Sequence, residues 1–598
     1  MVKGCNNTDL DNSGVASKYF LFYQVWRELT ERKTLDSYQF KVMNTLSILK
    51  ELRKVIDQRL KRHHCTNDNI NECKSEAVSI IKEDHILSEF YPIVKARLLS
   101  HVADKAETDT QQKALAYQIE YSLSIIEPNY LNNLLISLKE SIDNQENAAI
   151  IAKTNQLISC CAEKGWSSEA LFNVVGILKG SKDNDNCWEQ LKCKILAATD
   201  EYHILFPLKV RVISAQGQKT ESAREKVLNH IREFEIELLE KDEIICRYSG
   251  LNEKLEDNQK YLLMKVSAHD FYSASYMAIS KIADILNVFS FYNLINPWDM
   301  RDVTWISINT SNQYHKILKS KELYSTYDYL ESAGKVFRAA KQLEYGANHN
   351  VKVKLRATYS YTNMGKASYA QEEKFMNTWV ALESLCRTEM YDNIISNVLE
   401  TVPPALCLRY IYRLFRNFSE DCLRCNVSFD LEQNTINLKH PSKEKVVKDV
   451  ILAMNNENYY QEMLEKCSVN NLLVERCKEL HQIAVDGHEM FNRIDRHYCN
   501  IKRQLSRLYR IRNEIAHSAL NESASLIRYI EHLDDYLSSF VSEVVMCWEK
   551  NPNSNLEHIF EILKDNYRAY VSIKSSKKSA NPSLLLQGLR ETGVISLI

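Results

Sequence analysis

Apolar residues recur at spacings of three and four along the first third of the chain. One such series is Leu46, Leu49, Leu52, Ile56 and Leu60. This spacing places apolar side chains on one face of a helix, so the region 1–200 is predicted to form successive amphipathic helices. Helix breaks are expected at residues 127–129, around a proline, and at residues 180–186, where glycine and polar residues cluster.

The pattern changes near residue 201. Residues 203–213 and 351–359 are rich in β-branched side chains with partial alternation, which predicts strands. Residues 261–266 and 305–308 predict two more strands, and a helical series runs between them from about residue 268 to 291. We therefore interpret the region 201–369 as a mixed α+β regulatory region.

Helical spacing returns near residue 370, in the series 375–385, and continues to about residue 550. A long, loop-like insertion is expected from Cys425 to about Asn470. Residues 551–598 predict one more helix and a flexible basic tail. The low content of Gly (13) and Pro (9) also favours helices. The predicted fold class is mainly α with several domains, as expected for 598 residues.

The overall charge limits how the chain can recognise a partner. A formal charge of −2 and a pI near 6.8 exclude a protein that coats nucleic acid through bulk charge, so an RNA site must be a local basic patch. The N-terminus lacks the basic flank and apolar run of a signal peptide, and no segment approaches about 18 uninterrupted apolar residues. We expect a cytoplasmic protein without a membrane partner.

Sixteen cysteines are scattered without a repeating spacing, which indicates reduced thiols used as small core residues. Two clusters, residues 63–65 with Cys73 and Cys422 with Cys425, lack the second pair that a structural zinc site needs. We therefore expect no metal and no cofactor. The chain has no Gly-x-x-x-x-Gly-Lys loop to hold nucleotide phosphates, which disfavours an ATPase or GTPase.

The strongest candidate for a chemical site is the hexapeptide 512–517, Arg-Asn-Glu-Ile-Ala-His. Arg512 offers a planar fork of donors for a phosphate, and His517 can move protons near neutral pH. Asn513 can orient either group by hydrogen bonding. This combination of residue types suits the cleavage of an RNA phosphodiester.

The spacing of Arg and His alone carries little information. Residues 59–64 and 476–481 have the same spacing, but neither Arg is followed by an amide. Requiring Asn after the Arg reduces the chance expectation to roughly one in twenty. The pair at residues 512–517 is therefore the unusual one.

Three arginines precede the hexapeptide, at positions 503, 507 and 510. On a helix, Arg503, Arg507 and Arg510 would lie along one face that leads to the site and could follow an RNA backbone. The alternative for such a stripe is a solvated or salt-bridged helix face.

Helix geometry separates the two central residues. Five positions at about 100° each place Arg512 and His517 about 140° apart, whereas Asn513 and His517 share one face. A two-fold pairing of two such helices would supply two copies of each residue around one cleft. We therefore expect a homodimer or a higher even oligomer.

These residues carry a family resemblance. The pattern Arg512-Asn513-x-x-x-His517, followed by a helix from about residue 525 to 548, resembles the HEPN superfamily of metal-independent ribonucleases. The upstream block Phe375-x-x-x-Trp379 with the Ala-Leu-Glu step that ends at Glu383 is similar to the opening helix of the Apea-like branch. The match spans about residues 375–548, within a predicted HEPN domain at 370–550. Ser518 departs from the family pattern, since many relatives have Gly there.

The resemblance implies a dimeric helical bundle in which paired Arg-His motifs form one ribonuclease cleft. His517 would act as general base or acid, Arg512 would neutralise the phosphorane charge, and Asn513 would align them. Glu383, assigned through the resemblance, would orient Arg512. The substrate would be single-stranded or loop RNA, with transfer RNA a candidate, and the products a 2′,3′-cyclic phosphate and a 5′-hydroxyl.

Relatives of this kind are commonly toxins of prokaryotic abortive infection, that is, anti-phage defence. Since an unregulated ribonuclease would harm its host, the region before residue 370 is expected to sense a trigger, such as a phage product, and hold the nuclease shut. The alternative is a catalytically silent HEPN bundle that serves as a dimerisation or RNA-binding scaffold. A bundle modified by a nucleotidyltransferase is disfavoured by the length of the chain.

Overall fold

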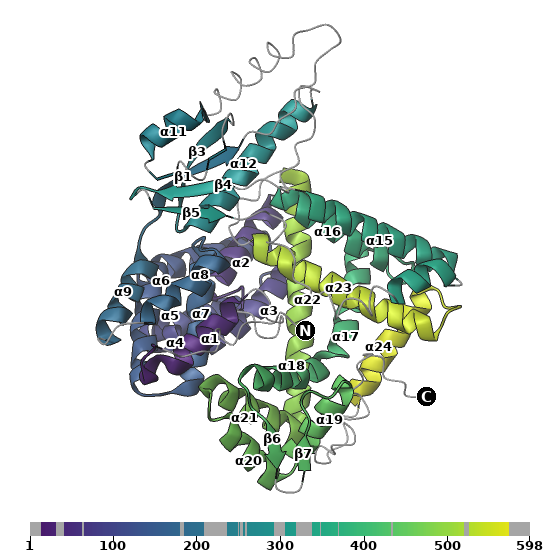
Figure 1. The fold of residues 1–598 in the computed structure, drawn as a ribbon. Helices are drawn as coiled ribbons and strands as arrows, with labels where there is room; N and C mark the ends of the chain where they lie inside the picture. Colours follow the sequence, from purple (N-terminus) through teal and green to yellow (C-terminus); the bar gives the residue numbers. More distant parts are fainter. Residues whose placement is uncertain are drawn as a thin grey trace.

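The computed structural model places helices along most of the chain, as expected for the predicted mainly α fold. It describes residues 14–31, 41–61, 65–179, 184–207, 236–248, 250–251, 255–256, 260–291, 305–311, 313–317, 338–346, 348–368, 370–431, 434–518 and 526–572. The helices group into an N-terminal and a C-terminal assembly, with a small sheet beside them (Figure 1). No described helix combines the length and apolar character that a bilayer crossing requires.

The N-terminal assembly packs around one apolar core that includes Phe22, Trp26 and Leu134. Its elements are η1 (Ser17–Tyr19), α1 (Phe20–Thr30), α2 (Thr45–Leu60), α3 (Asn67–Glu83), α4 (His85–Phe90), α5 (Pro92–Ala103), α6 (Asp109–Asp143), α7 (Asn147–Glu163), α8 (Ser168–Val174), η3 (Val175–Leu178) and α9 (Asn184–Leu196). Asn44 and Thr66 begin α2 and α3 with capping boxes, in which a side chain satisfies a free backbone amide.

The break predicted at residues 127–129 is wrong, because α6 continues through Pro128. An internal proline removes one backbone hydrogen bond and costs about 3 kcal/mol. Pro128 lies on the exposed side of the helix, whereas Ile126, Tyr130 and Leu134 on the other side are fully buried. The burial of this apolar face outweighs the local cost. Of the second expected break, residues 180–183 lie outside the described residues.

The sheet is antiparallel, and its strand order is β2-β3-β1-β4-β5. The strands are β1 (Asp200–Pro207), β2 (Glu237–Leu239), β3 (Tyr261–Ala268), β4 (Trp305–Asn309) and β5 (Tyr314–Ile317). Helix α12 (Phe271–Phe291) packs on the face that carries Ile204 and Phe206. Helix α11 (Lys241–Arg247) shares the opposite core with Leu205. The strands predicted at 261–266 and 305–308 and the helix between them are confirmed, as is 203–207; residues 208–213 lie outside the described residues.

The strand predicted at residues 351–359 is wrong, because this segment belongs to helix α15 (His349–Ala367). Asn348 caps the helix, and Val351, Leu355 and Thr358 follow at spacings of four and three and are buried. The β-branched composition of residues 351–359 predicted a strand, but tertiary packing favoured a helix. Val351 and Leu355 belong to the C-terminal core, so the C-terminal assembly includes residues before 370.

The remaining C-terminal elements surround this core. They are α16 (Gln371–Cys386), α17 (Ile394–Cys407), α18 (Tyr410–Arg424), β6 (Phe429–Leu431), β7 (Asn434–Ile436), α19 (Lys443–Met454), α20 (Glu457–Cys467), α21 (Asn471–Val485), α22 (Gly487–Ser518), α23 (Leu526–Lys550) and α24 (Leu556–Ser572). The expectation of a loop-like insertion from Cys425 to Asn470 is wrong. A hairpin and two helices fill it, and Val450 and Met463 are buried in the shared core.

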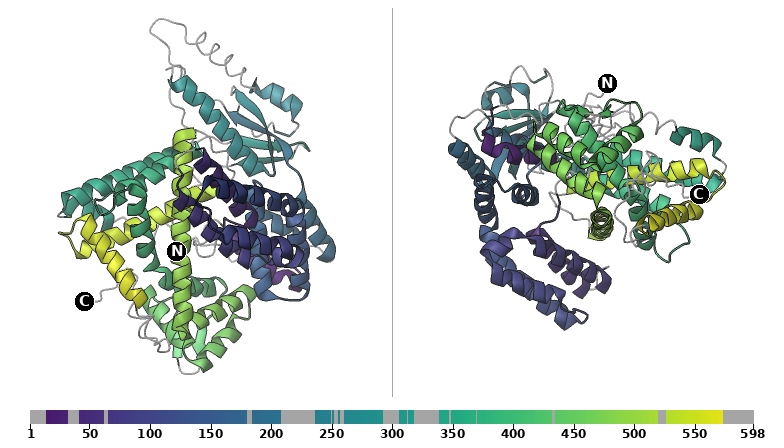
Figure 2. Two further views of the ribbon diagram at one scale, coloured as in Figure 1. Left: turned by 180° about the vertical axis from the view of Figure 1, so that it is seen from behind. Right: turned by 90° about the horizontal axis from the view of Figure 1, so that it is seen from below.

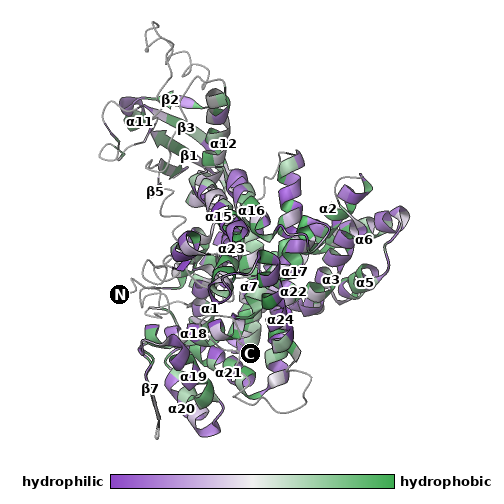
Figure 3. Cartoon of the chain, turned by 90° about the vertical axis from the view of Figure 1, so that its right-hand side faces the viewer, coloured by the Kyte–Doolittle hydropathy of each residue, from purple (hydrophilic) through white to green (hydrophobic). Residues whose placement is uncertain are grey.

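Helix α22 is 32 residues long and runs through the middle of the molecule. The N-terminal helices lie on one side of it and α15, α17 and α24 lie on the other, as the view from behind also shows (Figure 2). The helices carry both hydrophilic and hydrophobic residues (Figure 3), as expected for helices that each contribute one face to a core.

Candidate active site on helix α22

The amphipathic pattern of α22 fixes which residues can form a site. Ile494, Ile501, Leu505 and Leu508 recur at helical spacing and are buried in the C-terminal core. The tilted rings of Tyr509 and Trp379, 5.9 Å apart, pack the end of α22 against α16. The hexapeptide forms the last turns of the helix and so lies beyond the most deeply buried stretch.

Arg512 and Glu383 are distant in sequence but adjacent in the fold. Glu383 Oε2 lies 3.7 Å from Arg512 Nη2. Trp379 Nε1 donates a hydrogen bond of 2.7 Å to the other carboxylate oxygen of Glu383. Because Trp379 is fully buried, this bond holds the carboxylate toward α22. The arrangement positions a guanidinium through two groups on a neighbouring helix.

Asn513 adds a contact within the hexapeptide. Its Oδ1 accepts a hydrogen bond of 3.0 Å from Arg512 Nη1. The Arg512 side chain keeps 27% of its surface exposed while contacting Glu383. It is therefore oriented by two oxygen atoms and still reachable from solvent, which is the arrangement needed to bind a phosphate.

His517 lies in the last turn of α22 and is exposed. It follows Arg512 by five positions on a continuous helix, so the two side chains leave the helix axis about 140° apart. The separation anticipated from the sequence is therefore retained. Residues 519–525 lie outside the described residues.

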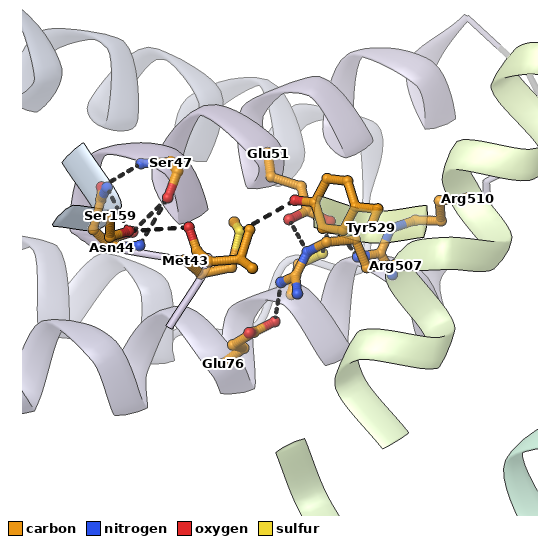
Figure 4. Close-up of polar contacts among 11 residues, drawn as sticks. Met43, Asn44, Ser47, Glu51, Glu76, Ser159, Arg507, Arg510 and Tyr529 are labelled. Carbon is orange, nitrogen blue, oxygen red and sulfur yellow. Dashed lines mark hydrogen bonds and ion pairs between the residues drawn. The ribbon is translucent and has the colours of Figure 1, made fainter. Parts of the chain in front are cut away.

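The three arginines predicted to bind RNA do not form an exposed stripe in this structure. Arg507 Nε lies 2.7 Å from Glu51 Oε2, and Arg507 Nη2 lies 2.6 Å from Glu76 Oε2. Arg510 also pairs with Glu51 (Figure 4). Arg503 Nη2 donates to Ser75 Oγ at 3.4 Å. The arginine face docks against helices α2 and α3, which corresponds to the salt-bridged alternative.

The electrostatics of this contact keep Glu51 ionised. Burial alone would raise the pKa of Glu51, but the attraction of Arg507 and Arg510 outweighs it and lowers that pKa to about 2. Glu51 and Glu76 in turn raise the pKa of Arg507 well above its usual value, against the opposing effect of burial. At neutral pH Glu51 is therefore ionised and faces two charged guanidinium groups.

Several residues near the site were not predicted from the sequence. Lys54 on α2 pairs with Glu514 at 2.5 Å. Glu51 and Glu76 are ordinary acidic residues of amphipathic helices, and the sequence carries no signal that pairs them with α22. Trp379 and Glu383, in contrast, are four positions apart on one helix, a spacing that indicates contact.

The cysteine and histidine clusters provide no second site. The described cysteines are free thiols, most of them buried. Within the described residues, no group of three or more His, Cys, Asp or Glu side chains is arranged to hold a metal ion. His63 and His64 of the first cluster lie outside the described residues.

Comparison of this chain with protein-family models, with curated proteins and with solved structures returned no match. The function is therefore inferred from the residues of the site and their geometry.

Proposed function

We propose that this protein is a metal-independent endoribonuclease of the HEPN type, with Arg512, Asn513 and His517 as its catalytic residues. The observation that carries the proposal is the position of Arg512, whose guanidinium lies between Asn513 and Glu383. The exposed His517 lies on the same helix end. An oriented arginine can stabilise the charge that develops on a phosphate, and a histidine can transfer the proton, so the two residue types supply the chemistry of phosphodiester cleavage without a metal.

The chemistry follows from these groups. His517 would remove the proton of a ribose 2′-hydroxyl, and the resulting alkoxide would attack the adjacent phosphorus. A second histidine would protonate the leaving 5′-oxygen, so the products are a 2′,3′-cyclic phosphate and a 5′-hydroxyl. Arg512 would stabilise the charge on the pentacovalent phosphorus, a contribution of about 3 to 4 kcal/mol for one preorganised donor.

The need for a base and an acid favours a homodimer. Each chain has one copy of the motif with Asn beside the Arg. Pairing the exposed ends of two α22 helices about a two-fold axis would bring a second His517 to the same phosphate. The substrate would be single-stranded or loop RNA, because its ribose can rotate into line with the leaving oxygen. Such an enzyme would act in the cytoplasm.

The resemblance to abortive-infection proteins suggests the physiological role. We propose a toxin that cleaves host or phage RNA after a phage-derived trigger and is otherwise held inactive. Supporting this role, the N-terminal helices contact the helix that carries the proposed catalytic residues.

The test is cleavage of total cellular RNA by the purified full-length chain, with the cut ends mapped. Wild type is expected to leave 2′,3′-cyclic phosphates in the presence of EDTA. His517→Ala and Arg512→Ala should each lower the rate by at least about a hundredfold. Arg496→Ala is the matched control, because Arg496 is an exposed arginine on the same helix and pairs with Glu489.

Two outcomes would contradict the proposal. Undiminished RNA cleavage by His517→Ala would exclude this site as the catalytic one. A strict requirement for magnesium would exclude the metal-independent mechanism. Equal RNA binding by wild type and His517→Ala, with no cleavage by either, would instead support a scaffold.

A further inference from the structure

The contact between α22 and helices α2 and α3 occupies the face of α22 that continues, at about 100° per residue, to Glu514 and His517, whereas Arg512 lies on the opposite side against Glu383. We call this contact the α22 seam and define it by six residues: Glu51, Ser75, Glu76, Arg503, Arg507 and Arg510. Arg507, the central residue, is 4% exposed and paired with two carboxylates. The seam ends two positions before the proposed catalytic arginine.

The chemistry of the seam resembles that of a bound phosphate chain. A carboxylate and a phosphodiester are both anions whose paired oxygens match the fork of a guanidinium. In the seam, Glu51 accepts from two arginines and Glu76 accepts from one. Two arginines of one helix face, Arg507 and Arg510, thus contact two acidic side chains, and Arg503 on the same face donates to the hydroxyl of Ser75.

The seam leaves part of its basic side unsatisfied. Arg510 Nε and Nη1 are buried and have no hydrogen-bond partner among the described residues. A buried donor without an acceptor raises the free energy of the closed arrangement. Opening the seam would let water or a phosphate oxygen reach these atoms.

The apolar residues on the two sides of the seam belong to separate cores. Ile48, Leu52 and Ala77 lie in the N-terminal core, whereas Leu505 and Leu508 lie in the C-terminal core. A joint made of charged groups between two cores resembles a transient interface more than a domain interior. Beside the seam, Val42 packs against the C-terminal core and Tyr529 Oη donates to Met43 Sδ at 3.7 Å, so opening the seam would separate these contacts as well.

We infer that Glu51 and Glu76 occupy the arginine face of α22 in place of RNA phosphates, so that seam closure and RNA binding on this face exclude each other. This inference depends on the proposed ribonuclease function, because it makes the seam the inhibitory contact of that site. RNA, or a trigger that separates the N-terminal helices from α22, opens the seam.

Alkylation of the Cys73 thiol can report whether the α22 seam is open. Its Sγ lies 4.0 Å from Glu51 Oε1, and the side chain is 1% exposed. Burial raises the pKa of this thiol to about 12. A closed seam therefore protects Cys73 from alkylation, and an open seam releases it. Cys161 is the control, since it is fully buried in the N-terminal core and away from α22.

The first experiment measures alkylation of the full-length chain by mass spectrometry, with and without a 2′-O-methyl RNA oligonucleotide that lacks the nucleophilic hydroxyl. We expect the oligonucleotide to accelerate labelling of Cys73 by at least about tenfold and to leave Cys161 protected. Labelling of both thiols would indicate unfolding and would contradict the inference.

The second experiment weakens the seam in a His517→Ala background, so that binding is measured without cleavage. Glu51→Gln with Glu76→Gln keeps the side-chain shapes and removes both charges. We expect tighter RNA binding, and a slope of log affinity against log salt that steepens by about 2, one unit for each of the released residues Arg507 and Arg510. Glu83→Gln is the matched control, because Glu83 lies on α3 and is 62% exposed in its pair with Lys41.

The results separate this inference from the proposed function. Specific cleavage by wild type, with Cys73 protected in the presence of bound oligonucleotide, would overturn the seam inference and keep the nuclease. An unchanged salt slope in the double variant would also overturn it. Absence of RNA binding by wild type and by the double variant would overturn both.

Discussion

Two clusters of buried ion pairs connect the N-terminal helices to the C-terminal assembly, and they differ in what surrounds them. The first is the α22 seam. The second, which we call the α21 joint, contains Glu28, Asp421, Arg424 and Arg476. Glu28 Oε1 lies 3.3 Å from Arg424 Nη2 and 3.5 Å from Arg476 Nη2, and Asp421 pairs with both arginines.

The α21 joint is reinforced by a residue that belongs to the neighbouring apolar core. None of the six residues of the α22 seam belongs to either core. Leu472 on α21 belongs to the N-terminal core, and its backbone amide donates to Gln24 Oε1 at 3.1 Å. Ion pairs alone stabilise little, because desolvation offsets most of the attraction between the charges. The comparison therefore indicates a permanent attachment at α21 and a separable contact at α22.

The largest expected effect comes from breaking the α21 joint. Arg476→Ala would leave Glu28 and Asp421 buried with one arginine between them, and should lower the free energy of unfolding by about 3 to 5 kcal/mol. Urea unfolding measures the loss. Arg416→Ala, which removes a more exposed pair with Glu420 on α18, is the control and should change stability by less than about 1 kcal/mol. A similar loss of unfolding free energy in both variants would show that the α21 joint stabilises the fold no more than an exposed ion pair does.

A smaller effect on stability is expected in the α22 seam. Arg507→Ala should cost less than about 2 kcal/mol of unfolding free energy, because the seam can open and hydrate Glu51 and Glu76. Alkylation of Cys73 should rise while Cys161 stays protected. A loss as large as that of Arg476→Ala, with both thiols exposed, would show that the two contacts are equivalent.

The exposed pair of Lys54 with Glu514, which lies beside the seam, should contribute least to stability. Lys54 keeps 52% of its side chain exposed in its pair with Glu514, so Lys54→Met should change the unfolding free energy by about 0 to 1 kcal/mol. The measurement is urea unfolding at low and high salt. A salt-independent loss above this range would assign Lys54 to the buried part of the seam.

No effect of pH is expected in the neutral range. The pKa of Glu51 is lowered to about 2 by Arg507 and Arg510, against the opposing effect of burial. Its contribution to closure is therefore complete above the unfolded value of about 4.3, and is lost as pH falls through about 2. Alkylation of Cys73, corrected for the thiolate fraction, should stay constant from about pH 8 to pH 5. An increase near pH 6 would point to a different titrating group.

Much of the local structure could be predicted because it depends on neighbouring residues. The apolar spacing of α2 and the helix after the hexapeptide, α23, are confirmed. The segment 351–359 shows where such reasoning fails, since its β-branched residues pack as a helix against α16. Pro128 fails for the same reason, because the burial of residues far along the chain outweighs a local cost.

In the candidate site, too, some features could be predicted from the sequence and others could not. Its residue types and helical phase were evident from the sequence, and in the fold Glu383 Oε2 lies 3.7 Å from Arg512 Nη2; the role of Glu383 stays a prediction. The environment of the arginine stripe was not evident. A stripe of positive charge on a helix looks the same whether solvent, RNA or acidic side chains will cover it.

The sequence by itself determined that this chain is mainly helical, that α22 ends in an Arg-Asn-x-x-x-His motif, and that three arginines precede the motif on one face. Only the tertiary structure decided what that face contacts. Arg507 meets Glu51 and Glu76 across 456 and 431 positions of sequence. Helical periodicity acts over a few residues, whereas the pairing of buried charges depends on which surfaces the whole fold brings together.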